Sequence, residues 1–239
     1  MQRSKIMNCK RTQGFTLIEI AIVLVIIGLL LGGVLKGQEL ITSARVRNLI
    51  SVQDGIKAAF FGFQDRFRAL PGDYTQASAV ANIRGVTFGG NGDGQILNTA
   101  GANEQTIAWN HLASAGFLNG SYTMATATEA VADTNTPKNP YSIYLQLVYD
   151  NNYADPGTAV AKHNLKTGNQ VPVEIMAEVD RKIDDGNAVQ GGFRFSRYTP
   201  ASATGLPAPA AYAVGVCASA TGQWYVVNSE TNCGGASLF

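Results

Sequence analysis

One glycine-rich stretch of the sequence carries side-chain oxygens at the spacing that calcium loops use. In Asn91-Gly92-Asp93-Gly94-Gln95-Ile96, ligand side chains alternate with glycines, and an apolar residue follows the second glycine by two positions. Calcium loops combine oxygen ligands at alternate positions with a glycine at the bend. In that register the first and twelfth positions are Gly89 and Ala100. Neither has a carboxylate, so the stretch is not an EF-hand.

Two interpretations of this loop stay open. A looser calcium site on Asn91, Asp93 and Gln95 would recruit Asp73 or Glu104 from outside the loop. Alternatively, the stretch is a turn in which glycine, asparagine and aspartate are used because they tolerate turn backbone angles. We expect no other cofactor.

The remaining polar clusters do not form a catalytic set. Asp180, Asp184 and Asp185 form a second acidic group, which we interpret as a solvated helix end followed by a turn. His111 and His163 are far apart in sequence, and neither lies in an H-E-x-x-H motif. The chain contains neither a G-x-S-x-G elbow nor a phosphate-binding P-loop. The sequence therefore predicts that the protein is not an enzyme.

A single acid, Glu19, lies in the most apolar segment of the chain. Residues 15–35 (FTLIEIAIVLVIIGLLLGGVL) include one charge in 21 positions, which is long enough for a helix across the hydrocarbon core. The preceding fourteen residues hold four basic side chains and no acid, so they should stay in the cytoplasm while the rest of the chain lies outside. An acid at the bilayer centre costs roughly 2.5–3.5 kcal/mol, less near an end, and usually has a partner and a function.

Cleavage between Gly14 and Phe15 would supply a partner for Glu19. The cut exposes a positive amino group on Phe15, and in a stack of parallel helices one subunit's Glu19 would meet a neighbour's amine and fix the register. A secretory signal would have a shorter apolar stretch and a small-x-small site after it, which Lys36-Gly37-Gln38-Glu39 does not offer. An uncleaved membrane anchor would leave Glu19 unexplained.

The basic leader, Gly14, the sequence Phe15-Thr16-Leu17-Ile18-Glu19 and the apolar run together resemble the prepilin signature of type IV pilins and type II secretion pseudopilins. The resemblance implies that a membrane prepilin peptidase removes residues 1–14, that Phe15 becomes N-methylated and that Glu19 directs assembly of a helical filament. It also implies a single-pass inner-membrane precursor with its head in the periplasm, an inner-membrane assembly platform, and a final place in a surface pilus or a periplasmic filament.

Apolar side chains continue on one helical face beyond the membrane segment, at Leu49, Ile56, Phe60, Phe63 and Phe67. The sequence Leu70-Pro71-Gly72 then supplies a helix stop. We therefore expect one helix over residues 15–69, about 80 Å long at 1.5 Å per residue, followed by a globular head over residues 70–239. A stripe of this kind is the core face of the helix against the head.

The head pattern is mixed. It predicts short helices at 104–118 and 173–183, with a strand as the alternative for the first half of 173–183. It also predicts strands at 142–149, 193–196, 212–217 and 224–227, and a proline-containing loop at 199–211. The fold class is therefore α+β: a long N-terminal helix packed on an antiparallel sheet with short helices. This arrangement resembles the pilin architecture.

Three cysteines occur in the chain: Cys9 in the leader, Cys217 and Cys233. Removal of the leader leaves an even pair, which favours a disulfide in an oxidising compartment over two unrelated thiols. The pair also matches the position of the disulfide loop that often holds the last strand region of pilins.

These features predict a structural subunit of a type IV pilus-like filament. A type II secretion pseudopilin is the alternative within the same class, and a membrane-anchored periplasmic enzyme or binding domain is the alternative from another class. The 225 residues after the leader leave a minor or adhesive role open, and the sequence does not indicate whether nucleic acid is bound.

Overall fold

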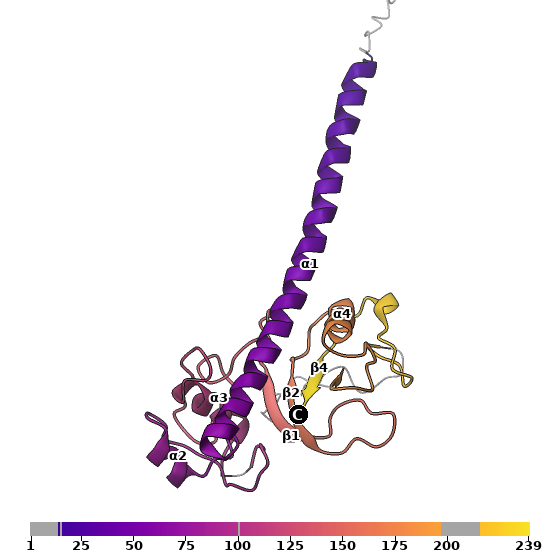
Figure 1. Cartoon of the computed structure of the whole chain (residues 1–239). Coiled ribbons are helices and arrows are strands. Elements are labelled where there is room, and N and C mark those ends of the chain that lie inside the picture. The colour runs from indigo at the N-terminus through magenta and orange to yellow at the C-terminus, as the bar shows by residue number, and fades with distance from the viewer. Residues whose placement is uncertain (1–13, 15, 100, 197–215) are drawn as a thin grey trace, which may run out of the picture. The chain divides into compact units, whose positions relative to one another are not determined.

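The computed structural model describes residues 14, 16–99, 101–196 and 216–239 (Figure 1). Its elements are α1 (Leu17–Phe67), α2 (Gln76–Asn82), α3 (Glu104–Ser114), β1 (Gln146–Asp150), β2 (Lys162–Lys166), α4 (Val173–Ile183), β3 (Phe193–Phe195), the 3-10 helix η1 (Val226–Asn228) and β4 (Gly235–Leu238). The chain divides into two compact units, residues 1–43 and residues 44–239, which are described separately.

The first unit contains the N-terminal part of α1. Large apolar side chains of this part are exposed almost without interruption from Leu17 to Ile41. An 18-residue window of the helix has a mean hydropathy of 2.8 and no buried share, so the helix is long and apolar enough to cross a membrane. Exposed apolar surface on this scale is unfavourable in water. It requires lipid or the apolar surfaces of other chains.

The second unit is built on a four-stranded antiparallel sheet with the strand order β1-β2-β4-β3. Leu147 pairs with Leu165 across β1 and β2, and Leu165 pairs with Ser237 across β2 and β4. The yellow strand β4 therefore lies beside β2 in Figure 1, although about 70 residues separate the two in sequence. The long helix, short helices and antiparallel sheet confirm the predicted α+β pilin-like class.

The part of α1 in the second unit packs against the sheet through a stripe at helical spacing. Its buried members are Val46, Leu49, Gln53, Ile56, Ala59, Phe60 and Phe63. Val46 and Leu49 join one apolar cluster with residues of α4 and β3. The members from Ile56 onward join a second cluster with residues of α3, β1 and β2. Each fully buried large side chain contributes about 1.5–3 kcal/mol.

Gln53 lies in the stripe between the two clusters. Its side chain is buried, and neither its amide nitrogen nor its amide oxygen has a hydrogen-bond partner among the described residues. A buried polar group without a partner costs about 1–3 kcal/mol. Gln53 is therefore the weak point of an otherwise apolar helix face.

A disulfide joins Cys217 to Cys233, which confirms the predicted pair. Cys233 also forms an antiparallel bridge with Val171, so the disulfide loop is tied to the segment that precedes α4. Closing a loop of 16 residues stabilises the folded state by about 3 kcal/mol in the chain-entropy account.

Three segments predicted in or just before the disulfide loop have different outcomes. The strand expected at 224–227 is wrong, because Trp224 makes a single bridge with Ala218 and residues 226–228 form η1. The loop expected at 199–211 and most of the strand expected at 212–217 lie outside the described residues.

Candidate functional site

Thr16 and Glu19 cap the N-terminus of α1 through reciprocal hydrogen bonds. The Thr16 backbone N–H and the Thr16 hydroxyl both donate to Oε2 of Glu19, at 2.8 and 2.7 Å, and the Glu19 N–H faces the Thr16 Oγ at 3.3 Å. This is a capping box, in which a threonine before the first turn and a glutamate three residues later satisfy each other's free donors. The negative charge also opposes the positive end of the helix dipole.

The capping box gives Glu19 a partner within its own chain. Thr16 and Glu19 both follow the predicted cleavage point, so removal of residues 1–14 would leave the pair intact. The T-x-x-E spacing is visible in the sequence but was not used in the prediction. Residues 1–13 and Phe15 lie outside the described residues, so the predicted contact between the Phe15 amine and Glu19 stays a prediction.

The predicted calcium loop brings three carboxylates together. Ligand oxygens of Asp73, Asp93 and Glu104 lie within 4.8 Å of one another. Asp73 accepts the backbone N–H groups of Gly92, Asp93 and Gly94 at 2.8–3.0 Å. These acids are largely engaged in holding the loop, in which Gly92 and Gly94 take positive φ angles of 79° and 82°.

Glu104 holds the two ends of the same loop. Its two carboxylate oxygens accept the N–H groups of Asn91 and Leu97, each at 3.0 Å. Burial raises the pKa of the Glu104 carboxyl, the two backbone donors oppose that rise, and the nearby negative charges of Asp73 and Asp93 add to it. The buried carboxylate thus replaces backbone partners that a strand would otherwise provide.

Among the predicted calcium ligands, only Asp93 joins the carboxylate group. The Asn91 side chain donates its Nδ2–H to Asp93 Oδ2 at 2.9 Å, and the Gln95 backbone N–H donates to Asp93 Oδ1 at 2.9 Å. These two N–H donors stabilise the negative charge of the Asp93 carboxylate by hydrogen bonds. The contacts therefore support the turn interpretation, and calcium binding stays a prediction.

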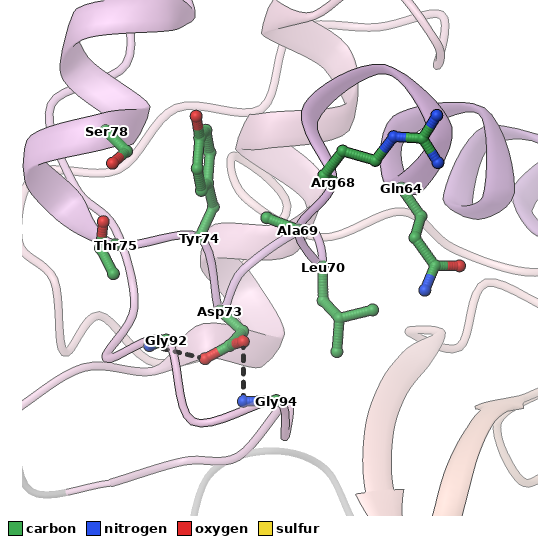
Figure 2. A pocket seen from close by; sticks show the side chains of 10 residues that line it. All are labelled: Gln64, Arg68, Ala69, Leu70, Asp73, Tyr74, Thr75, Ser78, Gly92 and Gly94. Atoms are coloured by element: carbon green, nitrogen blue, oxygen red, sulfur yellow. Dashed lines mark hydrogen bonds between the residues drawn. The ribbon is translucent and has the colours of Figure 1, made fainter.

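A pocket of about 420 Å³ lies beside this loop and had no signal in the sequence (Figure 2). Its lining residues are Gln64, Arg68, Ala69, Leu70, Asp73, Tyr74, Thr75, Ser78, Gly92 and Gly94. They come from the end of α1, the connection to α2, α2 itself and the glycine loop. In Figure 2 the Asp73 carboxylate bonds Gly92 and Gly94, which fixes the loop against this connection.

The two histidines are not brought together. His111 lies in α3, is fully buried, accepts the Gly72 N–H at Nδ1 (3.1 Å) and donates from Nε2 to the Phe88 carbonyl at 2.9 Å. Burial lowers the pKa of this imidazole to about 4. His163 lies in β2, with its ring 4.9 Å from that of Tyr149. His111 is therefore a neutral structural histidine that joins the backbone at Gly72 to the backbone at Phe88.

The second acidic group is also structural in its contacts. Asp180 is fully buried and accepts the indole N–H of Trp224 at 2.7 Å, which ties α4 to the disulfide loop. Burial raises the pKa of Asp180 to about 6, and the charges of Asp185 and Asp184 act in the same direction. Asp184 accepts the Phe193 N–H at 2.8 Å. The prediction of a solvated helix end is thus wrong for Asp180.

Residues 9–35 match the family described as the prokaryotic N-terminal methylation motif. This motif is the signature of type IV pilins and pseudopilins. No curated protein and no solved structure gives a significant match to the chain. The chain thus carries the prepilin-type signature on a pilin-like α+β fold, and this signature points to a structural, pilin-like protein.

Proposed function

We propose that this protein is a structural subunit of a type IV pilus-like filament. The precursor is cleaved after Gly14 by a prepilin peptidase, N-methylated at Phe15 and assembled through α1 and Glu19. The observation that carries the proposal is the exposed apolar part of α1, which begins with a capped glutamate inside the matched methylation motif.

Assembly would cover the apolar side chains that α1 exposes in the single subunit. In the inner membrane the lipid covers the segment from Leu17 to Leu35, and in a filament the same surface packs against the α1 helices of neighbouring subunits. When the subunit leaves the lipid, Glu19 enters the interior of the filament, where water is excluded and a buried charge needs a partner of opposite charge. The Phe15 amine of a neighbour is that partner, and the Thr16 donors hold the carboxylate in place until it arrives.

The proposed route places the subunit in two compartments. Before assembly it is a single-pass inner-membrane protein with its head in the periplasm, in contact with the peptidase and the assembly platform. After assembly it lies in a filament at the cell surface. A periplasmic secretion filament is the alternative end point, because the signature is common to both classes.

Three variants separate the charge of Glu19 from its role as a cap. Glu19→Gln keeps an acceptor for the Thr16 donors but removes the charge, Thr16→Ala removes the side-chain cap but keeps the charge, and Glu19→Ala removes both. We expect Glu19→Gln and Glu19→Ala to enter the membrane and to yield few sheared filaments by electron microscopy, and Thr16→Ala to assemble. Normal filaments from Glu19→Ala would refute the proposed role.

Mass spectrometry of the N-terminal peptide tests processing and location together. We expect a chain that begins at N-methylated Phe15 in the sheared surface fraction. The same terminus confined to the membrane fraction would favour the secretion pseudopilin. A terminus at Met1 in both fractions would contradict the prepilin interpretation and favour a membrane-anchored domain.

A further inference from the structure

Three aspartates gather where α4 ends, at a place that assembly through the apolar part of α1 does not use. Asp180 lies in the last turn of α4, and Asp184 and Asp185 follow the helix directly. One carboxylate oxygen of each aspartate lies within 4.8 Å of an oxygen of both others. Oxygens that ligate the same Ca²⁺ at their usual distance are at most about 5 Å apart. The spacing therefore suits three ligands of a single ion.

Asp180 carries a buried oxygen that has no partner. The side chain is fully buried, and its Oδ2 accepts the indole N–H of Trp224 at 2.7 Å, whereas Oδ1 has no hydrogen-bond partner among the described residues. The Gly186 N–H lies near this carboxyl, but it makes no hydrogen bond to Oδ1. A buried carboxylate oxygen without a partner is costly, because its loss of water is not compensated. A bound cation removes this cost.

Each of the other two aspartates also uses one oxygen to hold the backbone. Asp184 Oδ2 accepts the N–H groups of Gly192 and Phe193 at 2.5 and 2.8 Å. Asp185 Oδ1 accepts the Asn187 N–H at 2.8 Å. These hydrogen bonds orient both carboxylates and leave Asp184 Oδ1 and Asp185 Oδ2 without a hydrogen bond from the described residues. Each of the three carboxylates is thus held by one oxygen and has the other available for a ligand.

The charges around the aspartates favour a cation with more than one positive charge. The basic side chains of the same helix end, Arg181 and Lys182, both pair with Glu178, at 2.9 and 3.1 Å. Neither forms an ion pair with the three aspartates in the described part of the chain. The Lys57 ammonium of α1 is close enough to Asp184 to interact with its charge, but it supplies one positive charge against three carboxylates. The group therefore keeps an excess of negative charge.

We propose that Asp180, Asp184 and Asp185 bind a calcium ion, which fixes the end of α4 to the disulfide loop. The connection runs through Asp180, because its second oxygen binds Trp224, which lies between the two bridged cysteines. Asp184 and Asp185 are exposed, so water completes the shell of 6–8 oxygens that Ca²⁺ takes. Calcium suits this site better than magnesium, since Ca²⁺ accepts irregular oxygen arrangements and Mg²⁺ demands a near-ideal octahedron.

Terbium luminescence locates the ion, because Tb³⁺ occupies calcium sites and emits when a tryptophan beside it is excited. The chain has two tryptophans, Trp224 next to Asp180 and Trp109 in α3. Full-length processed protein in detergent micelles is freed of metal with a chelator and titrated with Tb³⁺. We expect emission that Ca²⁺ suppresses by competition, that Trp224→Phe abolishes and that Trp109→Phe leaves unchanged. Absence of emission, or emission that survives Trp224→Phe, overturns the proposal.

Calorimetric titration with Ca²⁺ alone then tests the ligands. Asp185→Asn keeps an acceptor for the Asn187 N–H but removes a charge, so it should weaken calcium binding at least tenfold, whereas Glu174→Gln, at an exposed acid in the first turn of α4, should not change it. Lys57→Gln removes a nearby positive charge and should strengthen binding.

Calcium should also raise the melting temperature of wild type and of Glu174→Gln, but not that of Asp185→Asn. A wild-type melting temperature that does not respond to Ca²⁺ at about 10 mM, or calcium binding that is unchanged in Asp185→Asn, overturns the proposal. Because unassembled protein is measured, these results are independent of filament formation.

Discussion

Replacement of His111 by asparagine tests whether a buried imidazole is kept neutral in the folded protein. The ring accepts the Gly72 N–H at Nδ1 and donates to the Phe88 carbonyl at Nε2, so both nitrogens are used by the neutral tautomer. A second proton on Nδ1 would face a donor and would have to be desolvated. This is the physical reason why the pKa of His111 is lowered to about 4 from 6.5.

The lowered pKa predicts a loss of stability in acid. Between pH about 6.5 and about 4 the unfolded chain binds a proton at His111 that the folded chain does not bind. Stability due to this group is therefore complete above pH 6.5 and falls as the pH is lowered through that window. At about 1.4 kcal/mol per pH unit, the total loss over this window is at most about 3.5 kcal/mol.

Asp180 acts in the opposite direction over nearly the same window. Its pKa is raised from 3.8 to about 6, so the folded chain keeps a proton there that the unfolded chain has lost. Stability due to Asp180 is lowered above pH 6 and recovers as the pH falls toward 4, again by at most about 3 kcal/mol. The two groups offset each other, and their combined contribution should change little between pH 4 and 6.

The assay is urea unfolding of the full-length protein in detergent, followed by tryptophan fluorescence at pH 4, 5, 6 and 7. His111→Asn should be less stable than wild type at pH 7, and the difference should shrink by about 2–3 kcal/mol at pH 4. Asp180→Asn should gain stability relative to wild type as the pH rises over the same range. A difference between wild type and His111→Asn that does not change with pH would refute the neutral imidazole.

Two further predictions concern the stability of the second unit. Gln53→Leu should raise the free energy of unfolding by about 1–2 kcal/mol, because it removes a buried amide that has no partner among the described residues; a lower midpoint in urea would contradict this account. Replacement of both Cys217 and Cys233 by alanine should cost about 2–4 kcal/mol. Reducing agent should destabilise wild type by a similar amount and leave the double variant unchanged.

Helices α1, α3 and α4 could be predicted because their sequences carry the signals that form them, whereas α2 was not predicted. The amphipathic stripe of α1 continues to Phe67, and the apolar face of α4 gives its limits of Val173 and Ile183 directly. Both signals depend on residues within one helix. Tertiary contacts are not needed to recognise them.

Two strands could not be predicted because contacts, rather than strand propensity, hold them in place. The β2 sequence KHNLK reads as polar, yet Lys166 is fully buried and its ammonium pairs with Asp150 at 2.9 Å. The β4 sequence GASL consists of small residues, and a Cβ on Gly235 would lie 2.3 Å from the Phe193 ring. Such positions are selected by neighbours that lie far away in sequence.

The candidate sites likewise divide into those that local sequence indicates and those that only tertiary contacts reveal. The motif around Glu19 is local, so the predicted assembly role of Glu19 needs no tertiary contact to be recognised, and it stays a prediction. Asp73 and the glycine loop are about 20 residues apart, and only the fold shows that the carboxylate binds the loop N–H groups. The pocket has no sequence signal, because its lining comes from two stretches of the chain, residues 64–78 and residues 92–94, that only the fold brings together.

The position of β4 also sets the order in which the second unit can form. β4 pairs with β2 on one side and β3 on the other, so neither neighbour has its full set of backbone bonds until residues 235–238 are available. Helix α1 can form as soon as it is synthesised, whereas closure of the sheet requires contacts across about 70 residues. A chain stalled during synthesis before Gly235 would therefore expose two unpaired strand edges, which are the surfaces that most readily aggregate.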